Sequence, residues 1–402
     1  MREHSAGSYE MHPKIGVHPT GTDPDNFIHA MPAYLKQLGA CGLKWVGGFA
    51  KNPPLGLPNV TGIQICNDVD TGIPLAVMDC AYLTGLRTAA VSTVIARRCA
   101  RADASELALL GCGFQGGMHL RFLLHALPAI QRVRLYDVRP GAVADLAARC
   151  RESNGFTGEL LPCDSARAAL EGAQVISTCT NGDEQIIRPE WFQAGTFGVG
   201  IEGGCAYTAG ALHQADKFIV DDIPLAEYFQ KISLGRKNDR GEDNPEFAGG
   251  IPPVHSTIGD IVAGKKSARD NDAERIIAIP IGMAICDIAL GHLTLARARE
   301  KGDRYARHQG NPQTSHPRPR PRERRRADLP ADVSSDHSRG TGIRAPQAPL
   351  DSWMNSPWGS TVKTSPPDWS EINPLPKDFT RAESEPIFTR SIRFRACKTA
   401  SV

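Results

Sequence analysis

The segment 106–116, ELALLGCGFQG, constrains the fold of this chain more than any other stretch. A short apolar run ends in the pattern G-x-G-x-x-G, and a helical pattern, MHLRFLLHAL, follows at 118–127. A strand, a glycine turn and a helix in this order are typical of the first turn of a dinucleotide-binding unit. Gly111 permits the tight turn, Gly113 lets the backbone approach a pyrophosphate, and Gly116 lets the helix pack closely on the strand.

The middle of the chain alternates between strand-like and helix-like segments. Further strand-like runs lie at 132–138, 173–180, 196–201 and 217–222, and a helical pattern lies at 141–152. Strands separated by helices predict βαβ units and a parallel sheet, and right-handed crossovers place the helices on both of its faces. The expected fold class is therefore α/β, with a Rossmann-type doubly wound parallel sheet.

The first hundred residues predict a smaller α+β domain. Segment 42–79 reads as strands joined by Gly, Pro and Asn turns, with a hairpin signal at VDTG (69–72), and an amphipathic helix is expected at 81–100. Arg87 lies among small residues and can fork two hydrogen bonds to a carboxylate. Lys44 lies between apolar neighbours, which favours a partly buried amine with a lowered pKa. Each alone is more often a surface cation, but together they suggest a site for a small carboxylated substrate.

The composition changes near residue 302. From 303 to 402 prolines and arginines crowd together and apolar periodicity disappears, so this tail is expected to be largely disordered. The arginines of RPRPRERRR (318–326) could contact phosphates. No aromatic residues interleave with them, however, which favours a solvated linker over nucleic-acid binding.

Bulk composition argues against several classes of function. The formal net charge of +2 gives no general attraction to nucleic acid or membranes. No run of about eighteen apolar residues predicts a membrane-spanning helix, and the first residues, MREHSAGSYEMHPK, lack the apolar core of a secretory signal. The eleven cysteines form no C-x-x-C pair, which favours reduced thiols in a cytoplasmic protein and no metal site.

The nucleotide preference depends on the end of the second predicted strand. Asp137 is placed to accept a hydrogen bond from a ribose hydroxyl, whereas Arg139 could instead pair with a 2′-phosphate. The carboxylate favours NAD as the cofactor, and NADP stays open.

Taken together, these segments resemble the ornithine cyclodeaminase/μ-crystallin family. The resemblance covers roughly 8–300 and rests on LKWVGGFAKNPPLGLPNVTG, NDVDTGIPLAVMD, LTGLRTAAVSTVIARRCAR, LALLGCGFQGGMHL and VRLYDVRP. It implies a Rossmann domain at 96–269 beside a substrate-binding and dimerisation domain made of 1–95 and 270–302, with a returning helix at 274–300. It also implies a homodimer that pairs through the N-terminal sheets. Relative to the family, the N-terminal domain is expected to be truncated.

The resemblance implies roles for individual residues. Lys44 matches the lysine that shuttles a proton near the reacting carbon, Arg87 matches the arginine that grips the substrate carboxylate, and Lys14 matches a further cation for that carboxylate. The residues that match the nucleotide site are Thr88, beside the phosphates, and Gly111, Gly113, Phe114, Gln115 and Asp137.

One family residue has no counterpart of the same type. The aspartate that orients the amine and takes part in proton transfer aligns with Gly204. Glu202, two residues earlier, lies on the same side of an extended strand and could supply the acid, although a structural carboxylate is the alternative. If the acid is lost, cyclodeamination loses support and plain imine reduction gains it.

The resemblance implies an NAD-dependent enzyme that acts on a small amino acid. In cyclodeaminases, hydride leaves Cα of ornithine for NAD⁺, the δ-amine attacks the resulting imine, ammonia departs, and hydride returns to give proline. The alternatives are an NAD(P)H-dependent imine reductase or amino-acid dehydrogenase, and a binding protein without turnover. Each enzymatic route needs a carboxylate clamp and an acid/base group near the nicotinamide.

Overall fold

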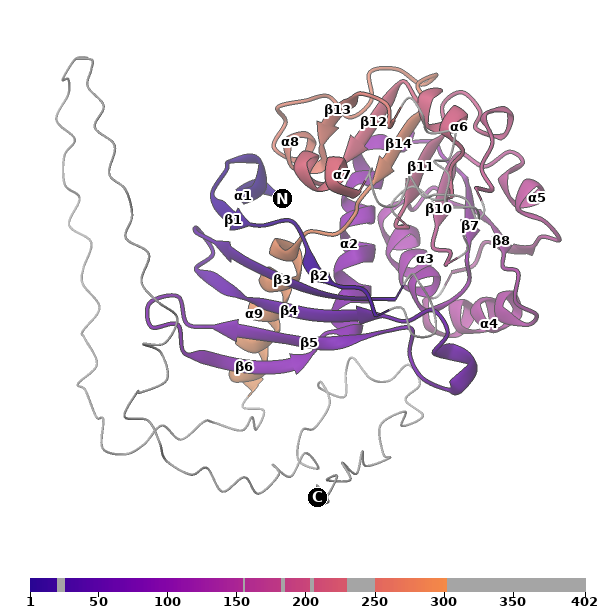
Figure 1. Ribbon diagram of the computed structural model, residues 1–402. Helices are drawn as coiled ribbons and strands as arrows, with labels where there is room; N and C mark the ends of the chain where they lie inside the picture. The colour runs from indigo at the N-terminus through magenta and orange to yellow at the C-terminus, as the bar shows by residue number, and fades with distance from the viewer. Residues whose placement is uncertain (20–25, 155, 182–184, 203–205, 230–249, 302–402) are drawn as a thin grey trace, which may run out of the picture. The chain divides into compact units, whose positions relative to one another are not determined.

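The computed structural model describes residues 1–19, 26–154, 156–181, 185–202, 206–229 and 250–301, all within one unit that spans 1–302. The strands of this unit form two separate sheets (Figure 1). The predicted tail at 303–402, with its arginine run at 318–326, and Gly204 lie outside the described residues.

The smaller sheet is antiparallel and comes from the N-terminal part of the chain. Its strands are β1 (Tyr9–Met11), β2 (Ile15–Val17), β3 (Phe27–Leu35), β4 (Ala40–Gly48), β5 (Val60–Asn67) and β6 (Pro74–Asp79). The order is β1-β3-β4-β5-β6, with β2 also paired to β3. β5 and β6 form the predicted hairpin. The helix α9 (Ala284–Lys301) packs against β3, β4 and β5, so one face of this sheet is covered (Figure 1).

The larger sheet is parallel throughout. Its strands are β7 (Glu106–Leu110), β8 (Arg132–Tyr136), β9 (Glu159–Pro162), β10 (Val175–Thr178), β11 (Phe197–Gly200), β12 (Lys217–Val220), β13 (Val254–Thr257) and β14 (Ile276–Ile279). The order β13-β12-β14-β11-β10-β7-β8-β9 confirms the predicted Rossmann-type doubly wound sheet.

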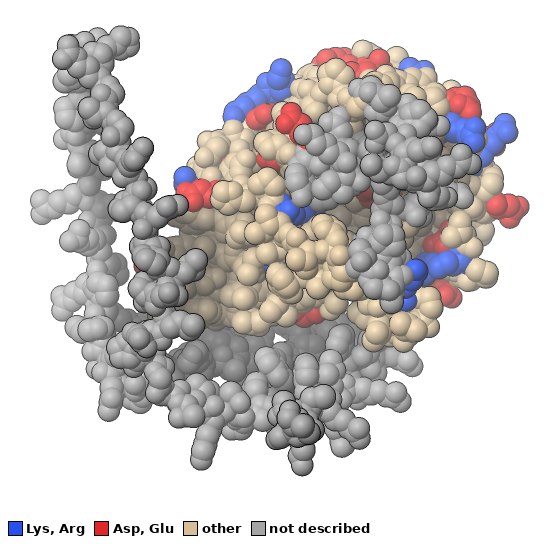
Figure 2. Space-filling model, viewed as in Figure 1, with Lys and Arg blue, Asp and Glu red and all other residues tan. Residues whose placement is uncertain are grey.

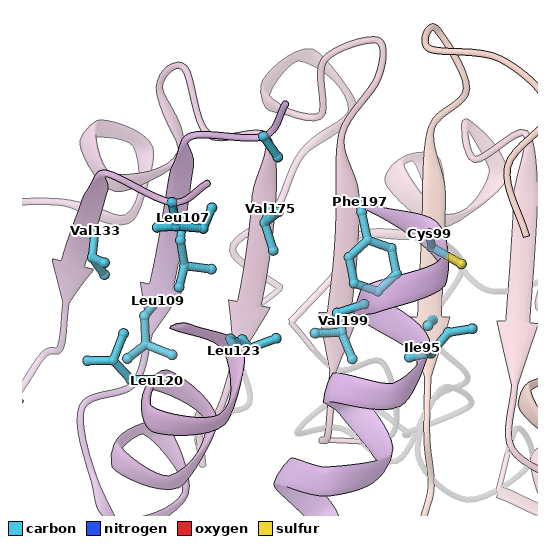
Figure 3. Close-up of a cluster of buried hydrophobic side chains, with 14 of the residues drawn as sticks. Ile95, Cys99, Leu107, Leu109, Leu120, Leu123, Val133, Val175, Phe197 and Val199 are labelled. Atoms are coloured by element: carbon cyan, nitrogen blue, oxygen red, sulfur yellow. The ribbon is translucent and has the colours of Figure 1, made fainter. Parts of the chain in front are cut away.

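Helices cover both faces of the larger sheet, as the crossover rule predicts. The helices are α2 (Ala81–Cys99), α3 (Phe114–Ala126), α4 (Ala142–Asn154), α5 (Ala166–Leu170), α6 (Ala209–His213), α7 (Ile223–Phe229) and α8 (Ile258–Val262), and the chain begins with α1 (Arg2–Ser5). One core joins the sheet to α2, α3, α4 and α8, and a second core joins its other face to α5, α6 and α7. Figure 3 shows Ile95 of α2 and Leu120 of α3 against Leu109 and Val199 of the strands.

The predicted helix at 274–300 is wrong in its first part. Residues Ile276–Ile279 form β14 in the middle of the larger sheet, and the helix begins only at Ala284. The apolar run at 276–279 fits a buried strand as well as a helix. Pro280 lacks a backbone N–H, which disfavours one continuous helix over 274–300. The segment that returns to the smaller sheet therefore begins with α9 at Ala284, whereas the prediction placed the return at 270. The division into domains otherwise stays a prediction.

The strand order places the glycine turn at a special point of the larger sheet. From β7 the chain continues through β8 to β9 on one side, whereas β10 and β11 lie on the other side of β7. In open α/β sheets, ligands bind in the crevice at such a reversal, outside the carboxyl ends of the strands. The turn 111–116 follows β7 at this crevice, beside the loop that follows β10.

Candidate active site

The glycine turn is shaped so that a phosphate can approach its backbone. Gly111 has φ +93°, and a Cβ there would collide with the carbonyl oxygen of Cys179. A Cβ on Gly116 would collide with the carbonyl oxygen of Gly111, so both positions require glycine. A Cβ on Gly113 would meet only Arg139 Nη2, at 3.4 Å. Space is thus left at the middle glycine, which is where a pyrophosphate needs to come close.

The helix that follows the turn can bind an anion at its first turn. Gly113 is the N-cap of α3, and no side chain caps the helix among the described residues. The first backbone N–H groups of a helix have no partner within it, and the helix dipole favours negative charge there. The turn and helix together fit the pyrophosphate of a dinucleotide.

Asp137 and Arg139 interact with each other at the edge of this turn. Asp137 Oδ2 accepts a hydrogen bond from the backbone N–H of Cys112 at 2.7 Å, and the Arg139 guanidinium donates to both carboxylate oxygens at 3.1 and 3.2 Å. Burial raises the pKa of Asp137, but these hydrogen bonds outweigh burial and hold it below its usual range. The side chain of Arg139 is 62% exposed and covers a carboxylate that is 6% exposed.

The other predicted nucleotide residues lie where α2 meets the turn. The ring of Phe114 packs so closely on Gly85 of α2 that a Cβ at Gly85 would lie 2.5 Å from it. Gln115 Oε1 is buried and accepts no hydrogen bond from the described residues. The Thr88 hydroxyl is buried and donates to the carbonyl of Thr84 at 2.6 Å. The proximity of α2 to the turn is shown, whereas a phosphate contact of Thr88 stays a prediction.

Lys44 and Arg87 converge on a carboxylate that the sequence analysis missed. Lys44 Nζ and Arg87 Nε each lie 3.0 Å from Oδ1 of Asp287. The three side chains come from β4, α2 and α9, and those of Lys44 and Asp287 are each only 1% exposed. Lys44 and Arg87 therefore lie together around Asp287, and a substrate site at this position stays a prediction.

Burial and charge shift the pKa values in this cluster in opposite directions. Burial lowers the pKa of Lys44, and Arg87 lowers it further, although Asp287 opposes both. Burial raises the pKa of Asp287, but Arg87 and Lys44 outweigh burial and keep it below its usual range. Asp287 Oδ2 is buried and has no hydrogen-bond partner among the described residues. The cluster thus holds an ionised aspartate and a lysine that loses its proton more readily than usual.

Lys14 is connected to the same cluster by a hydrogen bond to the segment that follows β14. Its Nζ donates to the carbonyl of Ile281 at 2.8 Å, and the next N–H, that of Gly282, donates to Asp221 Oδ2 at 2.6 Å. A Cβ on Gly282 would lie 2.7 Å from Nη1 of Arg87, so glycine gives the guanidinium its room. Burial, opposed by Asp221 but reinforced by Arg87, lowers the pKa of Lys14 to about 7.

The cluster lies at the same edge of the larger sheet as the glycine turn. Asp221 directly follows β12, and Gly282 follows β14, so both lie at carboxyl ends of parallel strands. The turn 111–116 follows β7 and lies at this edge as well. Burial lowers the pKa of His119 in α3 to about 4, and the charge of Arg87 contributes in the same direction, so Arg87 lies close to the helix that follows the turn. The cationic cluster therefore lies near the predicted cofactor crevice.

Glu202 is bound to the end of β10 and the loop that follows it. Its carboxylate accepts from the Thr178 hydroxyl at 2.8 Å and from the backbone N–H of Thr180 at 2.7 Å. Burial raises its pKa, and Thr180 and Thr178 oppose that rise. These bonds fix the loop after β10, and a catalytic role for Glu202 stays a prediction.

Two acidic residues of the site could have been found from the sequence. Asp287 stands in AICDIALG and Asp221 in KFIVDD, so each interrupts an apolar stretch. An ionised residue inside an apolar pattern is rarely buried without a partner, which is a signal to search for one. Both side chains are buried, at 1% and 0% residue exposure respectively.

The fold and the site define a dinucleotide-binding α/β protein with a cationic cluster beside the nucleotide crevice. The chain belongs to the ornithine cyclodeaminase/mu-crystallin family, whose model matches residues 1–302. No helix among the described residues has the length and apolar character needed to cross a membrane.

Three similar proteins illustrate the range of the family. The ornithine cyclodeaminase of Agrobacterium fabrum is 35% identical over 302 residues, which cover 74% of this chain and 78% of that protein. The alanine dehydrogenase of Archaeoglobus fulgidus is 32% identical over 304 residues, with 75% and 88% covered. A solved archaeal alanine dehydrogenase dimer with bound NAD has a TM-score of 0.64 and 31% identity, with 75% and 89% covered.

Proposed function

We propose that this chain is an NAD-dependent enzyme that moves hydride to or from Cα of a small amino or imino acid. The observation that carries the proposal is the Lys44–Asp287–Arg87 cluster near the crevice of the glycine turn. NAD, when bound, supplies the hydride acceptor or donor. The residues of the chain have to hold the substrate, orient it and move one proton.

Arg87 and Lys14 are suited to hold the substrate carboxylate. Only Nε of Arg87 is used by Asp287, which leaves the outer guanidinium nitrogens for a carboxylate. Lys14 has a lowered pKa and regains its proton readily when an anion binds beside it. Asp287 keeps the Arg87 and Lys44 side chains in place by accepting from both.

Lys44 is suited to proton transfer at the substrate nitrogen. A general acid or base works best with a pKa near the working pH, and burial moves the pKa of Lys44 in that direction. Oxidation of an amino acid requires loss of a proton from the amine as hydride leaves Cα, and reduction of an imine requires the reverse transfer. Lys44 can perform either transfer, while Asp287 stabilises the protonated amine.

The turn residues fit NAD better than NADP. Gly113 leaves room for the pyrophosphate, Gly111 and Gly116 permit the tight turn, and Asp137 directly follows β8, where a ribose hydroxyl would be bound. Arg139 has to swing away from Asp137 to expose that carboxylate, which its 62% exposure allows. NADP is the alternative, in which Arg139 binds the 2′-phosphate.

Imine reduction or amino-acid oxidation fits the described site better than cyclodeamination. Cyclodeamination needs a carboxylate that orients a second, side-chain amine. At the cluster, Asp221 accepts from Gly282, and Asp287 accepts from both Lys44 and Arg87 through Oδ1. Among the described residues the remaining oxygen, Asp287 Oδ2, has no partner, but it belongs to the carboxylate that already neutralises the two cations. Cyclodeamination stays as the second candidate because of the 35% identity to the cyclodeaminase of Agrobacterium fabrum.

The test is to supply the full chain with NADH, ammonium and pyruvate and to follow NADH oxidation, and separately with ornithine and NAD⁺ to follow proline. Lys44→Met should lower kcat by about 10²–10⁴-fold while NADH still binds, as measured by fluorescence. Lys36→Met is the matched control, because Lys36 is exposed and, within the described part of the chain, forms an ion pair only with the exposed Glu10. Equal rates in wild type and Lys44→Met would remove Lys44 from the mechanism.

We further propose that the chain forms a homodimer through the open face of the smaller sheet. Trp45, Ile63 and Val77 on this face are 43%, 43% and 54% exposed, and Ile15 and Val17 of β2 are 63% and 57% exposed. Figure 2 shows few charged side chains over this sheet. A contiguous apolar surface of this kind is typical of an interface. A cytoplasmic location is proposed as well, because no disulfide joins the cysteines of the described segments.

Trp45→Glu should convert the dimer to a monomer, as measured by sedimentation or light scattering. A buried, unpaired carboxylate at the centre of an apolar interface costs more than the contact gains. Leu293→Glu is the control, because Leu293 is 54% exposed on α9. A dimer that persists in Trp45→Glu would place the interface elsewhere.

A further inference from the structure

His29 of β3 lies on the same face of the smaller sheet as Lys44. The register pairs His29 with Val46 and Met31 with Lys44, so His29 and Lys44 are diagonal neighbours on the buried face. On its other side, His29 is paired with Gly16 of β2. Lys14 and His18 stand two residues before and after Gly16. The imidazole therefore borders the cationic cluster from the side of the edge strand.

The imidazole of His29 is positioned by packing. A Cβ on Gly16 would lie 2.7 Å from Cδ2 of His29, so glycine at 16 makes room for the ring. The Phe27 ring stacks on it at 4.4 Å between centroids, and the His18 ring meets it edge-on at 5.9 Å. No described residue makes a hydrogen bond to the His29 ring nitrogens. The ring is thus oriented while its N–H remains available to a ligand.

The surroundings of His29 are positively charged. Burial lowers its pKa to about 4, and Lys14, His18 and Lys44 contribute in the same direction. The nearby carboxylates do not offset this, since Asp287 is engaged by Lys44 and Arg87, and Asp221 by the N–H of Gly282. The cations that disfavour a proton on the imidazole also disfavour the ammonium group of a ligand beside it.

We propose that His29 determines substrate specificity by donating a hydrogen bond to the far end of the substrate side chain. The side chain it selects ends in a hydrogen-bond acceptor, with a carboxylate preferred, and not in an amine. This rests on the proposed function, in which Arg87 and Lys14 hold the α-carboxylate and Lys44 serves the reacting nitrogen. The preferred substrate class is therefore amino or imino dicarboxylic acids, and diamino acids are disfavoured.

Three unreactive acids with the same five-carbon chain test this directly. Glutarate, pentanoate and 5-aminopentanoate share one carboxylate and differ at the far end, which is a carboxylate, a methyl group or an ammonium. Their binding to the full chain saturated with NAD⁺ is measured by calorimetry, so that no turnover is needed. Glutarate should bind at least about tenfold more tightly than pentanoate, with 5-aminopentanoate weakest, as a charge-assisted hydrogen bond predicts.

His29→Ala should remove the preference for glutarate over pentanoate, and His29→Gln, which keeps a neutral donor, should retain part of it. His213→Ala is the control, because His213 is exposed and contacts only the carbonyl of Gly250 among the described residues. An unchanged preference in His29→Ala, equal binding of the three acids, or tighter binding of 5-aminopentanoate would overturn the proposal.

The same preparation separates this proposal from the proposed function. If NADH oxidation with pyruvate and ammonium occurs but the acids are not distinguished, only the role of His29 fails. If the acids are distinguished in a His29-dependent way but no hydride transfer to any imine occurs, the site binds dicarboxylates and the enzymatic proposal fails. Thermal melting of each variant verifies that it is folded.

Discussion

The glycine turn and the Lys44–Arg87–Asp287 cluster are built in opposite ways. The turn uses six consecutive residues, 111–116, and functions through backbone groups whose positions follow from local sterics. The cluster joins side chains separated by 243 and 200 positions in sequence, from three different elements. Altering the turn should change ligand affinity, whereas altering the cluster should also weaken the packing of β4, α2 and α9 against one another. Substitutions should therefore separate binding from stability.

The largest effect is expected from Asp287→Leu. Both Lys44 and Arg87 would be left without their shared anion, one of them fully buried, and breaking a buried ion pair in this way costs about 3–5 kcal/mol. Lys44→Met should cost less, because Arg87 still neutralises Asp287. The free energy of unfolding, from urea denaturation, measures both changes.

A double variant sharpens the interpretation of this result. Adding Lys44→Met to Asp287→Leu removes one of the two stranded cations, so the double variant should be more stable than Asp287→Leu alone. Simple addition of the two single costs would show that the charges are not coupled. In that case the cluster would not be the structural link between α9, β4 and α2 that the geometry indicates.

The same contrast explains what the sequence could predict. The glycine spacing, the α/β class and the burial of Lys44 depend on local sterics and on periodicity, and the structure confirms them. Asp287 was missed because its partners are distant in sequence, and no local pattern links the aspartate to Lys44. The 276–279 strand was taken for helix because a short buried apolar run has no diagnostic period.

A second prediction concerns the turn alone. Gly113→Ala should leave the fold intact, because its Cβ meets only Arg139 Nη2 at 3.4 Å. It should nevertheless weaken NADH binding by about tenfold or more, since the methyl group displaces the pyrophosphate from one or two backbone N–H groups. Fluorescence titration measures the affinity, and urea denaturation measures the stability.

The matched control lies four residues further along α3. A Cβ on Gly117 would meet Leu146 at 3.5 Å, an ordinary contact, so Gly117→Ala should leave NADH affinity unchanged. It should raise the free energy of unfolding by up to about 1 kcal/mol, because alanine favours the helix. If both variants lost NADH affinity equally, the loss would come from any methyl group added near the start of α3, and Gly113 would have no specific role.

The smallest effect per step is a pH dependence from Lys14, whose Nζ donates to the carbonyl of Ile281 beside the cluster. Folding lowers its pKa from 10.5 to about 7, so between these values the unfolded chain binds more protons than the folded chain. The free energy of unfolding must therefore rise with pH across this window, and the cost of burying Lys14 is present in full below it. Lys14→Met removes the titrating group and should flatten the curve by up to about 1.4 kcal/mol per pH unit. Lys36→Met, at an exposed position, should leave the slope unchanged. Parallel curves for wild type and Lys14→Met would show that the ammonium is well solvated, and Lys14 would then lie outside the carboxylate-binding site rather than within it.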